Sequence, residues 1–159
     1  MNRLTDNLKM VQVLGADIGG TNATSDYVSL ADYDQVVFDV MLGFADGDNT
    51  YSGWTAADKL DSLIVKQAIN SSGGSVKTLK DHSANAVVVA DHVAGTHYQI
   101  VVNADELDVA NDFTHVAVYV AESDDGGTDY VVITAVAAKA RFANENESGL
   151  TAATYVLES

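Results

Sequence analysis

The sequence of 159 residues contains no cysteine and no proline. Without cysteine the chain forms no disulfide, so a hydrophobic core must stabilise the fold. Globular domains average about 5% proline, and its absence removes one common way of protecting the edges of β-sheets. We expect acidic side chains in or beside the strands to take that role, at Asp26, Asp39, Asp91 and Asp129.

Basic residues are few, with 8 Lys and Arg against 23 Asp and Glu, so the net charge is −15. They are also scattered along the chain instead of forming a cluster. Because a strongly negative protein repels phosphates, we expect no binding to nucleic acid or to an anionic membrane.

Long apolar runs are absent as well. No stretch reaches the roughly 18 residues that cross a bilayer. The first residues, MNRLTDNLKMVQVLG, lack the apolar segment and small-residue cleavage site of a secretory signal. Since one domain usually has about 100–200 residues, we predict a single acidic domain that stays where it is synthesised or enters an assembly.

Apolar and polar residues alternate along several segments. Between residues 35 and 44 every even position is apolar, from Val36 to Phe44. A period of two is typical of a strand with one buried face, and the pattern recurs at residues 97–102 and 115–120. Further runs rich in Val, Ile, Thr and Tyr are residues 9–15, 24–30, 63–69, 75–79, 86–90 and 130–140.

Turn-forming clusters separate these candidate strands, for example at residues 19–22 and 124–127. Such regular spacing is typical of a β-sandwich or a β-barrel. The one helix candidate is residues 55–60, where Thr55 has the side chain of an N-cap. We divide the chain into an N-terminal arm (1–9), a sandwich domain (10–143) and a C-terminal extension (144–159), and expect both ends to become ordered on a partner.

Residues 14–22, LGADIGGTN, resemble the first phosphate-binding loop of sugar kinases in the actin-like ATPase superfamily. The resemblance implies that Asp17 helps to hold a hydrated metal and that the glycine backbone wraps the phosphates. That fold needs two lobes, and the rest of this chain contains no second phosphate loop. The alternative is a hairpin turn at Gly19 and Gly20 between two strands.

Two acidic loops, FADGDNT at 44–50 and ESDDGGTD at 122–129, carry the oxygen ligands that Ca²⁺ prefers. Neither completes an EF-hand, because Tyr51 replaces the sixth-position glycine of the first loop and no glutamate follows at the twelfth. The spacing of the four histidines fits no zinc site, and no G-x-S-x-G motif occurs; the histidines are His82, His92, His97 and His115. We predict no metal, no cofactor and no catalytic residues.

The second half of the chain, VVNADELDVANDFTHVAVYVAES followed by GTDYVVITAVAAKARFA, resembles head-decoration or minor capsid proteins of tailed bacteriophages. The shared elements are Leu107-Asp108-Val109, Phe113, the strand at 116–120 and the ending Ala140-Arg141-Phe142. In the first half, SLADYDQVVFDVMLG and DSLIVKQAINSSGGSVKTLK are similar to that family's two strands joined by a variable insertion.

The resemblance implies an all-β fold, a jelly-roll-like β-sandwich of about eight to nine strands with an extended N-terminal arm. It also implies a non-enzymatic cement protein, made in the host cytoplasm, that binds the major capsid protein on the virion surface, often as a homotrimer. For the capsid contact we predict the apolar side chains of the arm, which are Leu4, Leu8, Met10 and Val11. The alternative is that this arm frays or starts the first strand.

Tyr51 and Trp54 lie in the long loop between two predicted strands. Exposed aromatic side chains there would suit a surface-binding loop, whereas the same side chains can instead close one end of a sandwich. The first alternative leads to a second function, a carbohydrate- or host-surface-binding jelly roll displayed on a virion, with calcium in the acidic turns.

Overall fold

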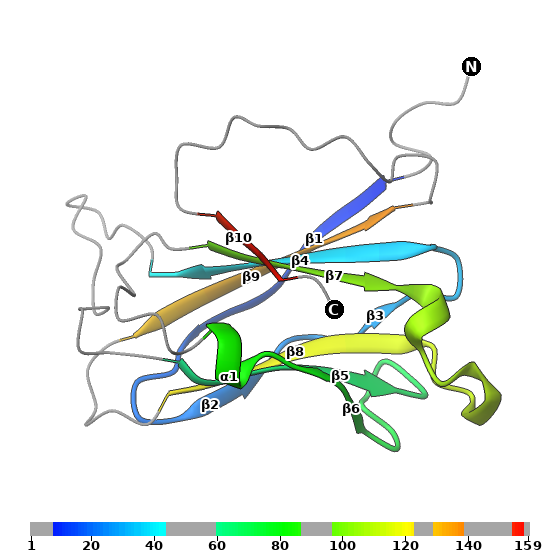
Figure 1. Cartoon of the computed structure of the whole chain (residues 1–159), viewed down its shortest axis with the longest axis horizontal. Coiled ribbons are helices and arrows are strands. Elements are labelled where there is room, and N and C mark those ends of the chain that lie inside the picture. The colour runs from blue at the N-terminus through cyan, green and yellow to red at the C-terminus, as the bar shows by residue number, and fades with distance from the viewer. Residues whose placement is uncertain (1–7, 44–59, 87–96, 123–128, 139–153, 158–159) are drawn as a thin grey trace.

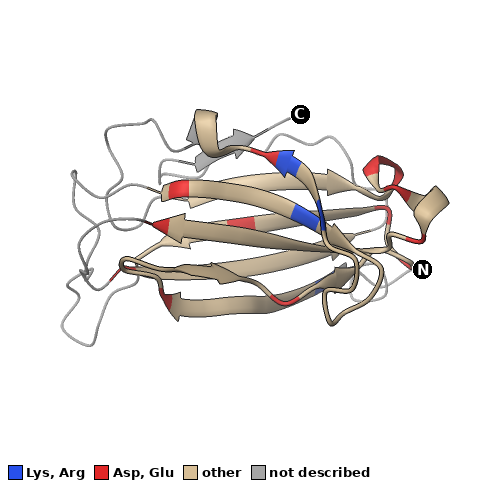
Figure 2. Cartoon of the chain, turned by 90° about the horizontal axis from the view of Figure 1, so that it is seen from below, with Lys and Arg blue, Asp and Glu red and all other residues tan. Residues whose placement is uncertain are grey.

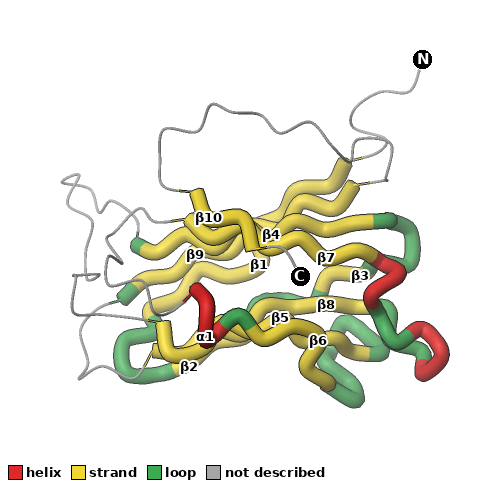
Figure 3. The backbone as a smooth tube through the Cα atoms, in the orientation of Figure 1, coloured by secondary structure: helices red, strands yellow, loops and turns green. Residues whose placement is uncertain are grey.

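Two β-sheets packed face to face make up the protein (Figure 1). The computed structural model describes residues 8–43, 60–86, 97–122, 129–138 and 154–157. In spatial order, the first sheet contains β1 (Leu8–Asp17), β9 (Tyr130–Ala138), β4 (Gln35–Leu42), β7 (His97–Asn103) and β10 (Thr154–Leu157). The second contains β2 (Asn22–Thr24), β8 (His115–Glu122), β5 (Leu60–Ala68) and β6 (Lys77–Asp81), and β3 (Val28–Ser29) also pairs with β8. Figure 3 shows these two layers of strands.

Helical structure in the described ranges is limited to three short elements. These are α1 (Ser83–Ala86) and the 3-10 turns η2 (Ala104–Glu106) and η3 (Val109–Asn111). Within those ranges no helix is long and apolar enough to cross a membrane.

The strands pair as one long ribbon folded back on itself. β1 pairs with β9, β2 with β8, β4 with β7 and β5 with β6, and every one of these pairs is antiparallel. The pairs are nested in chain order, and successive pairs fall alternately into the first and second sheet, which is jelly-roll topology. The predicted jelly-roll-like β-sandwich is therefore confirmed, and β3 and β10 add to the eight strands of the four nested pairs.

The alternation in the sequence fills the space between the sheets. In β4 every even-numbered side chain from Val36 to Leu42 is fully buried, and the side chains between them are only partly buried. β7 and β9 follow the same pattern, with Tyr98 and Ile133 among the largest buried side chains. Full burial of one large apolar side chain contributes about 1.5–3 kcal/mol, which is how a chain without disulfides is stabilised.

The predicted strand at residues 24–30 is interrupted, because the chain leaves the second sheet at Ser25 and Asp26. The Ser25 hydroxyl accepts a hydrogen bond from the Val118 amide (3.0 Å), and the Asp26 amide donates one to the Val13 carbonyl of β1 (2.9 Å). The run therefore divides into β2 and β3, and the segment between them bridges the two sheets.

Other local predictions are corrected or lie outside the described ranges. The hairpin predicted at Gly19 and Gly20 is wrong, because these glycines join β1 to β2 and those strands lie in different sheets. Of the strand predicted at 86–90, only Ala86 is described, and it is the last residue of α1. The helix predicted at 55–60 overlaps the described part only at Leu60, which starts β5.

The two predicted extensions both contribute to the first sheet. Residues 1–7 lie outside the described ranges, whereas Leu8 and Lys9, which the predicted division assigns to the arm, belong to β1. Within the C-terminal extension, Thr154–Leu157 forms β10, which pairs with β7 in parallel.

Candidate functional site

The most exposed apolar side chains on a strand of the described part lie on β1. Met10 is 70% exposed and Val11 is 38% exposed. Among the described strands β1 has one neighbour, β9, so its other side is a sheet edge. The Asp26 amide covers that edge at Val13. The predicted contact residues Leu8, Met10 and Val11 thus share the first half of an edge strand, whereas Leu4 is not described.

Met10 also begins an apolar row on the outer face of the first sheet. Strand register places Met10 beside Val136 of β9, Val136 beside Val37 of β4, and Val37 beside Val101 of β7. The three valines are partly exposed. We call these four residues the outer row. Sequence reasoning missed the valines, although Val37, at an odd position of β4 where a fully solvated face would carry a polar residue, was a usable signal.

A polar row follows immediately, formed by Gln12, Thr134, Asp39 and Gln99 in register. One Asp39 carboxylate oxygen lies 3.0 Å from Nδ1 of His97. Its other oxygen is buried and has no hydrogen-bond partner among the described residues. The prediction that Asp39 protects a sheet edge is wrong, because β4 is a central strand between β9 and β7. Of the other acidic positions, Asp91 is not described.

The DIGGT segment forms a turn that is held by carboxylates. Asp17 Oδ1 accepts hydrogen bonds from the amides of Gly19 (3.1 Å) and Asp129 (2.9 Å). Glu122 Oε2 accepts one from the Gly20 amide (2.7 Å). A phosphate loop needs such amides to face the ligand. Here the amides of Gly19 and Gly20 instead donate to the carboxylates of Asp17 and Glu122. The turn therefore fastens β1 and β2 to the ends of β8 and β9.

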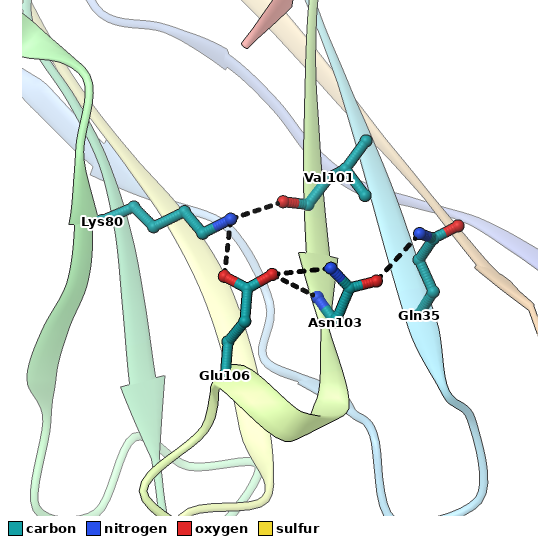
Figure 4. A network of polar contacts seen from close by, with 5 residues as sticks. All are labelled: Gln35, Lys80, Val101, Asn103 and Glu106. Carbon is teal, nitrogen blue, oxygen red and sulfur yellow. Dashed lines mark hydrogen bonds and ion pairs between the residues drawn. The ribbon is translucent and has the colours of Figure 1, made fainter. Parts of the chain in front are cut away.

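A polar cluster joins the two sheets next to η2 (Figure 4). Lys80 Nζ of β6 lies 2.6 Å from Glu106 Oε2 and donates to the carbonyl of Val101 in β7 (2.9 Å). Glu106 Oε1 accepts from the backbone and side-chain nitrogens of Asn103 (3.0 and 2.8 Å). The Asn103 side-chain oxygen accepts from Gln35 Nε2 of β4 (3.0 Å). We call this five-residue group the clamp.

The clamp stabilises the charged form of Glu106. Burial alone would raise the pKa of this carboxyl group. The hydrogen bonds from Lys80 and Asn103 outweigh burial, so the pKa of Glu106 is lowered. The cluster is therefore an ionised contact that holds an edge of the second sheet against β7.

The other lysines of the second sheet also have partners. Lys77 Nζ lies 2.9 Å from Asp108 Oδ2, and Lys66 Nζ lies 3.8 Å from the centre of the Tyr119 ring. The hydrogen bonds from Lys77 and Asn111 lower the pKa of Asp108. Figure 2 shows how few basic positions there are among the described elements.

The histidines that the structure describes belong to different segments: His82 lies between β6 and α1, His97 in β7 and His115 in β8. His82 is buried, and burial lowers its pKa. His115 contacts Thr114, and burial lowers its pKa as well. Within the described ranges no three His, Asp or Glu side chains gather as a metal site would require. His92, most residues of both acidic loops, and Tyr51 and Trp54 are not described, so the surface-binding loop stays a prediction.

We compared the chain with protein-family models, curated proteins and solved structures, and none of the three comparisons found a match.

Proposed function

We propose that this chain is a non-enzymatic structural protein of a tailed-phage virion, which binds the major capsid protein on the outer surface of the head and stabilises the shell. The jelly-roll sandwich is compatible with this role, and the sequence resemblance favours it. The observation that carries the proposal is the first half of β1, an edge strand with exposed Met10 and Val11.

An edge strand of this kind supplies two forms of adhesion. Backbone groups on the side of β1 that faces away from β9, where no other described strand pairs, can add to a strand of a partner, and side chains such as Met10 can enter a pocket on it. Full burial of one methionine is worth about 1.5–3 kcal/mol, which is weak for one contact. A capsid repeats the same site many times, and a homotrimer would join three such contacts, so modest contacts stabilise the assembled shell.

The test compares two acidic substitutions at similarly exposed apolar positions. Met10→Asp changes the edge of β1, and Val109→Asp changes η3, where Val109 is 65% exposed. We expect Met10→Asp to lose binding to heads stripped of the native protein, and Val109→Asp to bind like the unchanged chain. The readout is co-sedimentation with the heads, followed by DNA release on heating.

Two outcomes would contradict the proposal. Equal binding of Met10→Asp and the unchanged chain would remove β1 from the interface. Equal DNA release from heads with and without the protein would remove the stabilising role. Binding to glycans that is lost on Trp54→Ala would instead favour the surface-binding alternative.

A further inference from the structure

The last described strand, β10, is not needed to complete the jelly roll. The eight nested strands close the sandwich without it, and β10 lies outside them on the free side of β7. Its four residues form the one parallel pair among the described strands, with Thr154 beside His97 and Leu157 beside Ile100. Parallel pairing is slightly less stable per residue than antiparallel pairing, and this pair is only four residues long.

The clamp limits the edge of β7 to a site of about the length of β10. Lys80 Nζ donates a hydrogen bond to the Val101 carbonyl, and Glu106 Oε1 accepts one from the Asn103 amide. These side chains occupy backbone groups just beyond Ile100, where the pairing with β10 ends. The segment from His97 to Ile100 is therefore an acceptor for one short strand, and we call it the β7 acceptor.

The connection to β10 is long enough to reach beyond its own sandwich. β9 ends at Ala138, which is level with Asn103 through Gln35, whereas β10 starts level with His97. The offset is about 20 Å along the strands and about 14 Å across three strand spacings. The 15 residues 139–153 can span about 50 Å when extended. This length exceeds the offset to the β7 acceptor of the same chain, so the connection has length to spare for an acceptor on a second copy that lies close by.

We propose that β10 is an exchanged strand, and that in an assembly of copies the β7 acceptor of one copy takes residues 154–157 of the next. Exchange of an identical element keeps every native contact, so it costs little once copies lie side by side. An isolated chain fills its own acceptor, because a short tether gives an effective concentration of about a millimolar. The proposal concerns contacts between copies and does not depend on the role in the virion.

The absence of cysteine allows a direct test by disulfide trapping. Gln99 and Val156 are register partners in the β7–β10 pair, at the separation of neighbouring strands that a disulfide can bridge. Chains with Gln99→Cys and chains with Val156→Cys, distinguished by mass, are unfolded together, refolded at high concentration and oxidised. A disulfide between the two kinds of chain forms efficiently only if the strand has moved between copies.

The control measures random collision. Chains with Val109→Cys, an exposed position on η3, replace the Gln99→Cys chains in the same mixture. We expect the mixed dimer of the Gln99→Cys and Val156→Cys chains to exceed the control dimer by at least about tenfold, because exchange holds the two thiols at an effective concentration of about a millimolar.

The double variant Gln99→Cys/Val156→Cys tests whether β10 pairs with β7 within one chain. If it forms a disulfide within one chain while the mixed single variants form no more dimer than the control, β10 pairs only within its own chain and the proposal is wrong. The proposal is equally wrong if neither experiment yields the disulfide, since β10 then does not pair with β7. Loss of head binding by Met10→Asp is a separate result and changes neither conclusion.

Discussion

Two edge strands of the sandwich, β1 and β6, differ in how their side chains are used. β1 exposes Met10 and Val11 at an edge where, among the described residues, Asp26 bonds to the backbone at Val13. β6 carries Lys77 and Lys80, and both are engaged by acidic side chains of the segment that follows β7. Lysines are a common protection for sheet edges, and on β6 both lysines are paired within the molecule. Of these two edges, β1 is therefore the one that we propose for contact with a partner.

The largest expected effect comes from breaking the clamp at β6. Lys80→Met leaves the Glu106 carboxylate and the Val101 carbonyl without the ammonium group. Only 10% of the Lys80 side chain is exposed, so we expect a loss of about 1–3 kcal/mol in the free energy of unfolding. Urea unfolding of the purified variant measures it.

Lys77→Met is the matched control on the same strand. Its side chain is 56% exposed and its ion pair is solvated, so the expected loss is below about 1 kcal/mol. Equal losses from the two substitutions would mean that the clamp does not hold β6 more firmly than a surface ion pair.

The second effect is a dependence on acid. Because the folded state lowers the pKa of Glu106, its contribution to stability is present above the usual value of 4.5 and is lost as pH falls through the lowered pKa. We therefore expect Glu106→Gln to be less stable at neutral pH and to lose less stability as pH falls below 4.5. Urea unfolding as a function of pH measures it, with the exposed neighbour changed in Asp105→Asn as control. Parallel curves for all three proteins would contradict this assignment.

A third, smaller effect concerns salt. With a net charge of −15, self-repulsion should ease as salt screens exposed charges beyond about 8–10 Å. The melting temperature should rise as salt increases to about 0.15 M, by about 2–4 °C for each kcal/mol of repulsion removed. A flat or falling curve in differential scanning calorimetry would show that attractive pairs such as Lys77 with Asp108 dominate.

The smallest effect is expected at β1 itself. Met10→Ser removes a side chain that is mostly solvated in the free protein, so the free energy of unfolding should change by less than about 0.5 kcal/mol. Urea unfolding checks this, and a loss comparable to that of Lys80→Met would mean that Met10 serves the fold instead of a partner.

The sequence predicted the elements whose signal is local. The alternation from Val36 to Leu42 identified β4, and similar runs identified β7, β8 and β9. A period of two can be recognised from neighbouring residues alone. Pairing is not local, so the sequence could not tell that β4 is central and that Asp39 lies away from an edge.

The contacts that define the candidate site depend on the fold in the same way. Lys80 and Glu106 are far apart in the chain and meet because the fold brings β6 of the second sheet close to η2, which follows β7 of the first. The interruption at Ser25 and Asp26 likewise needs Val118 and Val13 to be in place. For the edge strand, the sequence singled out Leu8, Met10 and Val11 as apolar contact residues, and the structure places all three on β1, with Met10 and Val11 exposed.

The central claim is that the first half of β1 meets the capsid, and a cryo-EM map of the native particle tests it most directly. We predict a jelly-roll density on the outside of the head, with residues 8–12 facing the shell and β6 facing solvent. A map in which β1 faces solvent while β6 meets the shell, or in which the protein is missing from the head, would contradict the account.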